Sequence, residues 1–77
     1  MLRAKTTDDL VKIASAGGGM RTNLVGRSTE DIARVAAAAF QGGTKLYLLG
    51  MGGRPNNDLI QIALAGQGAV IFEDEHA

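Results

Sequence analysis

The apolar and polar positions of the chain follow one short pattern three times. Each copy begins with polar residues and an acid, continues with apolar residues at positions i, i+3 and i+4, and ends at glycine before an apolar run. The clearest copy spans residues 28–50. Apolar residues at this spacing form one face of a helix, and a short apolar run after a glycine turn is typical of a strand. The pattern therefore predicts a helix, a turn and a strand in each copy.

The three copies align on an acid at the start of each predicted helix, which is Asp9, Asp31 or Asp58. An aliphatic residue follows each acid, and one turn later an aliphatic residue and an alanine recur on the inward side of the helix: Ile13-Ala14, Val35-Ala36 and Ile62-Ala63. Internal repeats of about 20–50 residues usually mean stacked supersecondary units. The sequence therefore predicts a tandem αβ repeat.

Capping and glycine signals give the bounds of the predicted elements. A hydroxyl at Thr6 or Thr7 caps the first helix, which ends at Gly17, and Ser28 or Thr29 caps the second. The second and third helices cover residues 30–41 and 57–65, and the strands cover residues 20–25, 45–49 and 69–72. The first strand is too polar for a buried central strand, so we expect it at an edge of the sheet or with one face in water.

The alternating order of helices and strands predicts an α/β fold. We expect three tandem helix-turn-strand units that form a small, mainly parallel sheet with the helices packed on it, joined by right-handed crossovers. If the strand order follows the sequence, the helices lie on one face and the other face is uncovered. A ragged, doubly wound order is the alternative. We assign residues 1–72 to this single domain and residues 73–77 to an acidic, frayed C-terminal tail.

The second and third predicted strands are apolar on both sides, so one layer of helices leaves apolar side chains uncovered. We expect a second chain to cover them, in a homodimer or higher homo-oligomer packed sheet against sheet or edge against edge. This favours an adaptor-like or inhibitor-like protein-interaction module that binds itself, with another protein as a further candidate partner. The alternative is a compact monomer whose own tail covers the apolar face. The predicted interface residues are Leu46, Tyr47, Leu49, Val70 and Phe72.

Composition narrows the function classes. The 77 residues carry 8 basic and 8 acidic side chains, so the net charge is zero, which argues against nucleic acid or a membrane surface as a partner. The apolar runs are far shorter than the roughly 20 residues that cross a bilayer. The absence of cysteine fits a reducing compartment, and we expect a cytoplasmic protein. A chain this short, rich in alanine and glycine, builds only a thin core of its own.

A second hypothesis is a small anion-binding or nucleotide-binding site at the carboxyl ends of the first two strands. Ligands bind at this edge in open α/β sheets, and the N–H groups of helix starts attract anions. Acids already occupy the helix starts, which opposes an anion there, and the glycine run lacks the spacing of a dinucleotide or P-loop motif. The residues of this predicted anion shelf are Arg27, Gly50, Gly52, Gly53 and Arg54, with Lys5 at the aligned position of the first unit.

Catalytic and metal-binding signals are weak. The chain has one histidine, His76, in the acidic tail, and no cysteine, and Ser15 and Ser28 have no evident base. We therefore expect no enzyme activity, no cofactor and no metal site. The helix-then-strand order resembles that of leucine-rich and other αβ repeats, but the spaced leucine–asparagine signature is absent, so we assign no family.

Overall fold

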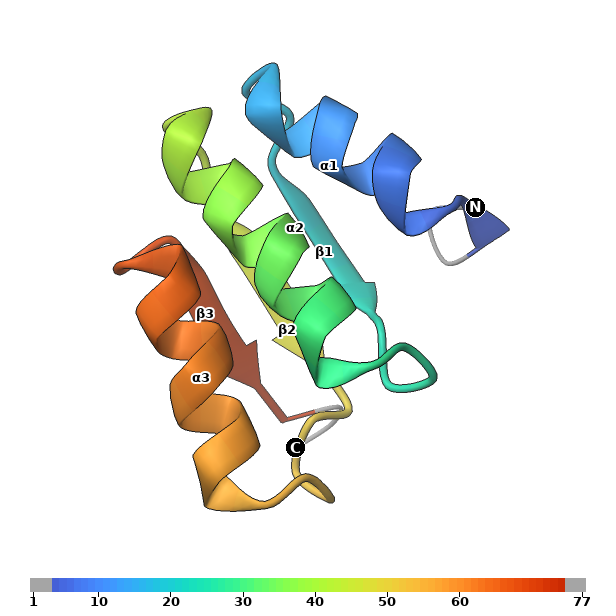
Figure 1. Cartoon of the computed structure of the whole chain (residues 1–77), viewed down its shortest axis with the longest axis vertical. Helices are drawn as coiled ribbons and strands as arrows, with labels where there is room; N and C mark the ends of the chain where they lie inside the picture. The colour runs from blue at the N-terminus through green and yellow to red at the C-terminus, as the bar shows by residue number, and fades with distance from the viewer. Residues whose placement is uncertain (1–3, 75–77) are drawn as a thin grey trace.

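The computed structural model describes residues 4–74, in which three helices alternate with three strands (Figure 1). The helices are α1 (Thr7–Ser15), α2 (Thr29–Gln41) and α3 (Asn56–Gly66), and the strands are β1 (Met20–Asn23), β2 (Leu46–Leu49) and β3 (Val70–Glu73). The predicted α/β fold with its three helix-turn-strand units is confirmed. The observed element ends lie within one or two residues of the predicted ones.

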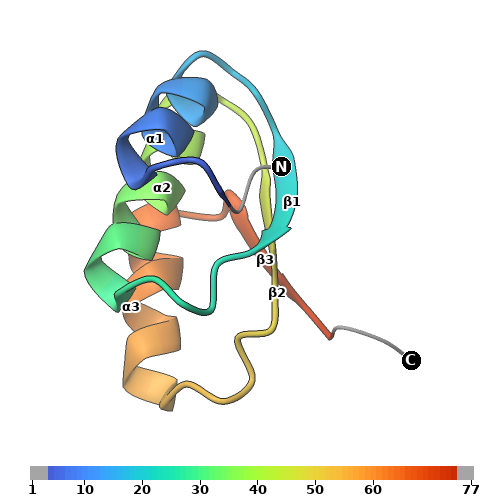
Figure 2. The ribbon, with the colours of Figure 1, turned by 90° about the vertical axis from the view of Figure 1, so that its right-hand side faces the viewer.

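The three strands form one parallel sheet in the order β1-β2-β3. The register pairs Met20 with Leu46 and Leu46 with Val70, so the strands stand level with one another. All three helices lie on one side of the sheet, and no helix of the described chain covers the other side (Figure 2). Consecutive crossovers of one hand produce this one-sided arrangement. Of the two orders left open by the sequence, the strands adopt the one that follows the sequence, and the doubly wound order is excluded.

Hydroxyl side chains begin the first two helices. Thr6 Oγ1 accepts a hydrogen bond from the N–H of Asp9, and Ser28 Oγ accepts one from the N–H of Asp31, both at 3.1 Å. These bonds satisfy backbone donors that the first helical turn leaves without an intrahelical partner. α3 begins after Pro55 and has no side-chain cap. The predicted alternatives are thereby resolved to Thr6 and Ser28.

The hydrophobic core lies between the helices and the covered face of the sheet. Its largest fully buried side chains are Leu10, Leu24, Ile32, Val35, Leu46, Leu48 and Ile62. Four of these side chains lie in helices. They occupy the repeated aliphatic positions, either directly after the shared acid or one turn later: Leu10, Ile32, Val35 and Ile62. β2 is the central strand, so both of its core side chains are fully buried, whereas the side chains of β3 at the edge are partly exposed.

Glycine and alanine bring neighbouring helices close together. A Cβ placed on Gly42, at the C-terminus of α2, would stand 2.0 Å from the carbonyl oxygen of Ala14 in α1. A Cβ on Gly66 of α3 would lie 3.3 Å from the Cβ of Ala36 in α2. In each case the end of one helix lies against a buried alanine of the preceding helix. These small residues determine how closely successive units pack.

Polar side chains join α1 and α2 nearer to the N-terminal ends of the two helices. Arg34 Nη2 donates to Asp8 Oδ1 at 2.7 Å, and Thr7 Oγ1 donates to Asp31 Oδ2 at 3.4 Å. The hydrogen bond from Arg34, together with its charge, lowers the pKa of the Asp8 carboxyl group. Solvent screens this exposed ion pair, so it orients the two helices more than it stabilises them.

The predicted boundary between the domain and the C-terminal tail is wrong at Glu73. We assigned it to the acidic tail, but it is the last residue of β3 and forms an ion pair with Arg21 of β1. The charge fits a strand because this residue lies on the uncovered side of the sheet, where its carboxylate meets water and a cation. The rest of the predicted tail after Asp74 lies outside the described residues. Between residues 4 and 74, no helix is both long enough and apolar enough to cross a membrane.

The substitution Gly42→Ala is expected to lower the free energy of unfolding by about 1–3 kcal/mol, because the added methyl group forces α1 and α2 apart. Gly52→Ala is the matched control, since a Cβ at Gly52 meets nothing within 4 Å. Urea denaturation followed by circular dichroism measures both variants. Equal stability of the two would contradict the close approach of the helices.

The Asp8 carboxyl group is expected to titrate below its ordinary pKa of 3.8, because Arg34 stabilises the charged form. The contribution of this pair to stability is therefore present above the ordinary pKa and is lost as the pH falls through the lowered pKa of the folded state. NMR titration of the Asp8 carboxyl carbon measures the midpoint. In Arg34→Gln the midpoint should rise, and an unchanged midpoint would show that the pair does not form in solution.

Candidate protein-interaction surface

The uncovered side of the sheet presents alternate side chains of the three strands. Side chains of a strand alternate between its two faces, and in β1 and β2 every second residue is buried beneath the helices. The register places the other side chains in two rows across the sheet. We call this set the free face. It consists of Arg21, Asn23, Tyr47, Leu49, Ile71 and Glu73.

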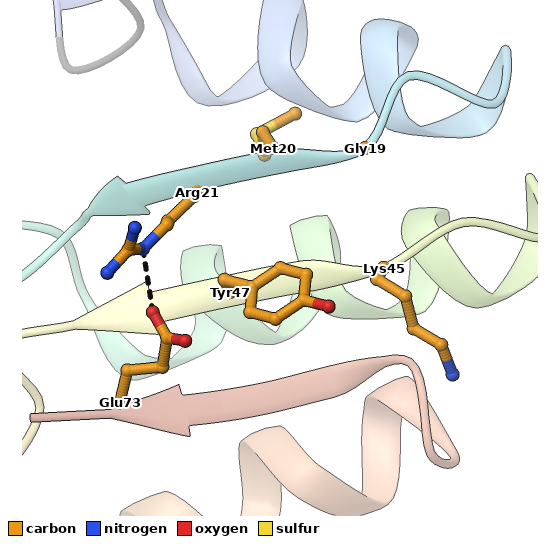
Figure 3. Close-up of a pocket in the computed structure, with 6 residues that line it drawn as sticks. All are labelled: Gly19, Met20, Arg21, Lys45, Tyr47 and Glu73. Carbon is orange, nitrogen blue, oxygen red and sulfur yellow. Dashed lines mark hydrogen bonds and ion pairs between the residues drawn. The ribbon is translucent and has the colours of Figure 1, made fainter.

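An ion pair spans the free face. Arg21 Nε on β1 lies 2.7 Å from Glu73 Oε1 on β3, so the two side chains meet across the central strand β2 (Figure 3). The Arg21 side chain is 64% exposed and that of Glu73 is 31% exposed. Solvent screens such a pair, and its contribution to stability is at most about 1 kcal/mol. Its main effect is to hold two long side chains over one end of the free face.

Tyr47 lies at the centre of an open depression on the free face. Figure 3 shows its ring between the Arg21–Glu73 pair and the side chain of Lys45. Lys45 Nζ donates to the carbonyl oxygen of Gly68 at 3.1 Å. An aromatic ring with charged groups around it has the composition of a protein contact, in which aromatic residues are enriched and the rim is polar. The depression has a volume of about 470 Å³ and is lined by Gly19, Met20, Arg21, Lys45, Tyr47 and Glu73.

The structure divides the five predicted interface residues between two faces. Tyr47 and Leu49 lie on the free face, whereas Leu46, Val70 and Phe72 alternate with free-face residues and lie on the helix side. Leu46 is 0% exposed and cannot contact a partner. The prediction treated both sides of an apolar strand as one surface, and the two-residue period of a strand separates them. Phe72 is partly exposed because β3 is at the edge of the sheet.

Ile71 is the apolar residue of the free face that sequence analysis missed. It pairs in register with Tyr47, next to Leu49 on the same face. The signal that could have found it is strand alternation, because a residue between two core residues of a strand points to the opposite face. With Ile71 included, the free face carries apolar side chains on β2 and β3, and its other positions hold Arg21, Asn23 and Glu73.

The arginines of the predicted anion shelf bind the chain itself. Arg54 Nη1 donates to Thr29 Oγ1 at 2.7 Å, and Nη2 donates to the carbonyl oxygens of Val25 at 2.8 Å and Arg27 at 2.5 Å. The guanidinium therefore joins the loop before α3 to the loop before α2. Its Nε atom is buried and has no hydrogen-bond partner among the described residues. Both Nη atoms already donate to the chain, so an anion would have to compete with these bonds.

Arg27 makes the same contact one unit earlier. Its Nη1 donates to Thr7 Oγ1 at 2.8 Å, and its Nη2 donates to the carbonyl oxygen of Lys5. Thr7 and Thr29 occupy one position of the repeat, and Lys5, Arg27 and Arg54 occupy another. The bonds form a ladder in which the arginine before a helix binds the start of the preceding unit. The anion site stays a prediction, and the ladder opposes it because an anion would have to compete with these bonds.

The glycines of the predicted shelf belong to the turn after β2. Gly50 has a φ of +76°, and a Cβ on it would lie 2.5 Å from Nδ2 of Asn23. A Cβ on Gly52 or Gly53 would meet nothing within 4 Å. Backbone conformation and close approach therefore explain glycine at the first of these positions without a ligand.

Acidic and metal-ligating groups do not gather in the part of the chain that the structure describes. Within residues 4–74, no group of three His, Cys, Asp or Glu side chains could hold a metal ion. His76 lies outside the described residues. In the depression the carboxylate of Glu73 is already bound to Arg21.

No family model, curated protein or solved structure matches this chain.

Arg54→Met is expected to lower the free energy of unfolding by about 1.5–3 kcal/mol, because it removes charge-assisted hydrogen bonds between two units. Arg21→Met is the matched control and should cost less than about 1 kcal/mol, since its ion pair is exposed. Urea denaturation measures both. The opposite order would contradict the structural role of Arg54, and stabilisation of the wild type alone by millimolar phosphate would support the anion shelf instead.

Proposed function

We propose that this chain is a small non-enzymatic protein-interaction module whose first partner is a second copy of itself. The observation that carries this proposal is the exposure of large apolar side chains that one chain leaves uncovered. Leu64 and Ile60 on α3 are 71% and 55% exposed, and Phe72 on the edge strand β3 is 39% exposed. Single exposed apolar residues are normal on a protein surface, whereas several in one region indicate a contact.

The uncovered sheet supports the same proposal. Parallel sheets are usually covered on both faces, and their strands are correspondingly apolar on both sides. Here the helices cover one face, and Tyr47, Leu49 and Ile71 remain partly exposed on the other. The Arg21–Glu73 ion pair crosses β2 among these apolar side chains, and such a mixture of aromatic, aliphatic and charged groups is typical of a protein contact.

The free face is nevertheless too small to hold two copies together by itself. Strands of four residues span about 13 Å, and three strands span about 14 Å, which gives an area on the order of 180 Å². Stable interfaces bury roughly 800 Å² on each partner. Self-association therefore has to use more of the molecule than this face.

We propose a module without enzyme activity because the charged side chains of the depression already have partners. Arg21 binds Glu73, and Lys45 donates to a backbone carbonyl. An anion at the strand ends would compete with the hydrogen bonds of Arg54. We place the module in the cytoplasm because its sequence contains no cysteine, which fits a reducing compartment.

The native mass is expected to rise with protein concentration, from that of one chain toward that of two. Sedimentation equilibrium over a range from micromolar to millimolar protein measures this mass. Added salt should not weaken the association, because apolar contacts are not screened as charge pairs are. A mass that stays at one chain over the whole range would contradict self-association, and a mass that falls with added salt would contradict an apolar contact.

A further inference from the structure

In a stack of such units, each helix packs on the helix of the next unit. One helix side of this kind, on α3, has no neighbour among the described residues. In the repeat alignment, Ala14 and Ala36 face the following unit, and they are 1% and 0% exposed because α2 and α3 pack on them. The aligned residue of α3 is Ala63, which is exposed. The outer side of α3 therefore corresponds to the sides of α1 and α2 that pack on the next helix, and no element within residues 4–74 packs on it.

This outer side of α3 is apolar. Ile60 lies one turn before Ala63 and Leu64, so the three side chains are neighbours on the helix surface. Phe72 of the edge strand β3 adds an aromatic ring that is 39% exposed. Figure 1 shows α3 and β3 together at one edge of the molecule. We call this surface the α3–β3 end. It consists of Ile60, Ala63, Leu64 and Phe72.

The outer side of α1, at the opposite end of the array, is charged. Asp31 and Arg34 of α2 contact the preceding helix, so the aligned residues of α1, Asp9 and Lys12, point away from α2. Both are exposed, as is Lys5 before the helix. A polar outer face is what the terminal repeat of a stacked array needs in water. The α1 end is therefore suited to solvent, and the α3–β3 end is suited to a partner.

The positions of Ile60 and Leu64 decide how a second copy fits. A head-to-tail stack would repeat the contact between α1 and α2, in which Val11 and Ser15, the residues aligned with Ile60 and Leu64, stay partly or largely exposed. Such a stack would therefore leave these two apolar side chains in water. A two-fold axis beside β3 places apolar side chains against apolar side chains. The same axis runs β3 antiparallel to its copy, so the backbone groups at this sheet edge pair with each other.

We infer that two copies of this chain associate about such an axis through the α3–β3 end. The contact pairs the two β3 strands and packs the two α3 helices side by side, which joins two three-stranded sheets into one. The inference rests on the proposed self-association and names its surface. α3 is about 16 Å long and β3 about 13 Å, so the contact is at the small end of protein interfaces and the dimer is reversible.

Leu64→Lys and Ile60→Lys test this contact, and Val25→Lys is the matched control. Val25 is an apolar residue 54% exposed, close to the 55% of Ile60, but it follows β1 and lies outside the α3–β3 end. Because all three side chains are largely exposed, the variants should keep the circular dichroism spectrum and urea midpoint of the wild type. Sedimentation equilibrium should give a dimer Kd at least about tenfold higher for Leu64→Lys and Ile60→Lys, and an unchanged Kd for Val25→Lys.

Amide hydrogen exchange tests the pairing of the edge strands. In concentrated wild-type protein, exchange in β3 should slow relative to dilute protein, because strand pairing protects its outward N–H groups. β1 is the internal control, since it is also an edge strand of four residues and should exchange equally fast at both concentrations. Equal slowing in both edge strands, or slowing in β1 alone, would overturn the assignment to β3.

The outcomes separate this contact from self-association itself. A wild-type protein that stays monomeric at millimolar concentration overturns both. A wild type that dimerises, together with Leu64→Lys and Ile60→Lys variants that dimerise equally well and a Tyr47→Lys variant that does not, leaves self-association in place. In that case the α3–β3 contact is overturned and the interface includes the free face.

Discussion

Each helix–strand unit of this molecule depends on contact with its neighbour. The helices have 9, 13 and 11 residues, and helices shorter than about 12–15 residues are marginal in water without packing. Three kinds of contact recur at both junctions between successive units: hydrogen bonds between parallel strands, the approach of a helix-ending glycine to an alanine of the preceding helix, and arginine bonds between loops. All three connect each unit to the one before it. The repeated sequence pattern therefore determines both the fold of each unit and its packing on the preceding unit.

A stack built in this way has a direction and two unlike ends. Each unit offers one side to its predecessor and the other to its successor, and the chemistry of these sides differs. Toward the N-terminus the outer side carries the charges of Asp9 and Lys12, and toward the C-terminus it carries Ile60 and Leu64. The joints inside the molecule are filled by alanine and glycine because the helices there lie close. Ile60 and Leu64 are larger than these residues. A partner that packs on them must therefore lie farther from α3, or at a different angle, than a fourth identical unit would.

Local signals made most of the fold predictable. Caps such as Thr6 and Ser28 and the recurring apolar positions act within one turn, and the parallel order with one layer of helices follows from repeated crossovers of one hand. Which strand side chains face the helices and which face away was not predictable in the same way. β2 is apolar at every position, so polarity does not distinguish the buried Leu46 from Tyr47 on the free face. The partners of Arg54 depend on how two loops approach each other in the folded chain. The exposure of Ala63 was not predictable because its sequence position matches those of the buried Ala14 and Ala36, and it is exposed because no element within residues 4–74 packs on it.

Pairing at the α3–β3 end would leave the free face open and change its size. An axis perpendicular to the sheet keeps the two free faces on the same side, so Tyr47, Leu49 and Ile71 of both copies would line one surface. Six strands at the usual spacing make that surface about 29 Å across, twice the width available to one chain. A further protein bound there could contact both copies at once, and its affinity would then depend on the dimer because a single chain offers half the contact. Self-association and binding of another protein would thus be linked through the geometry of one sheet.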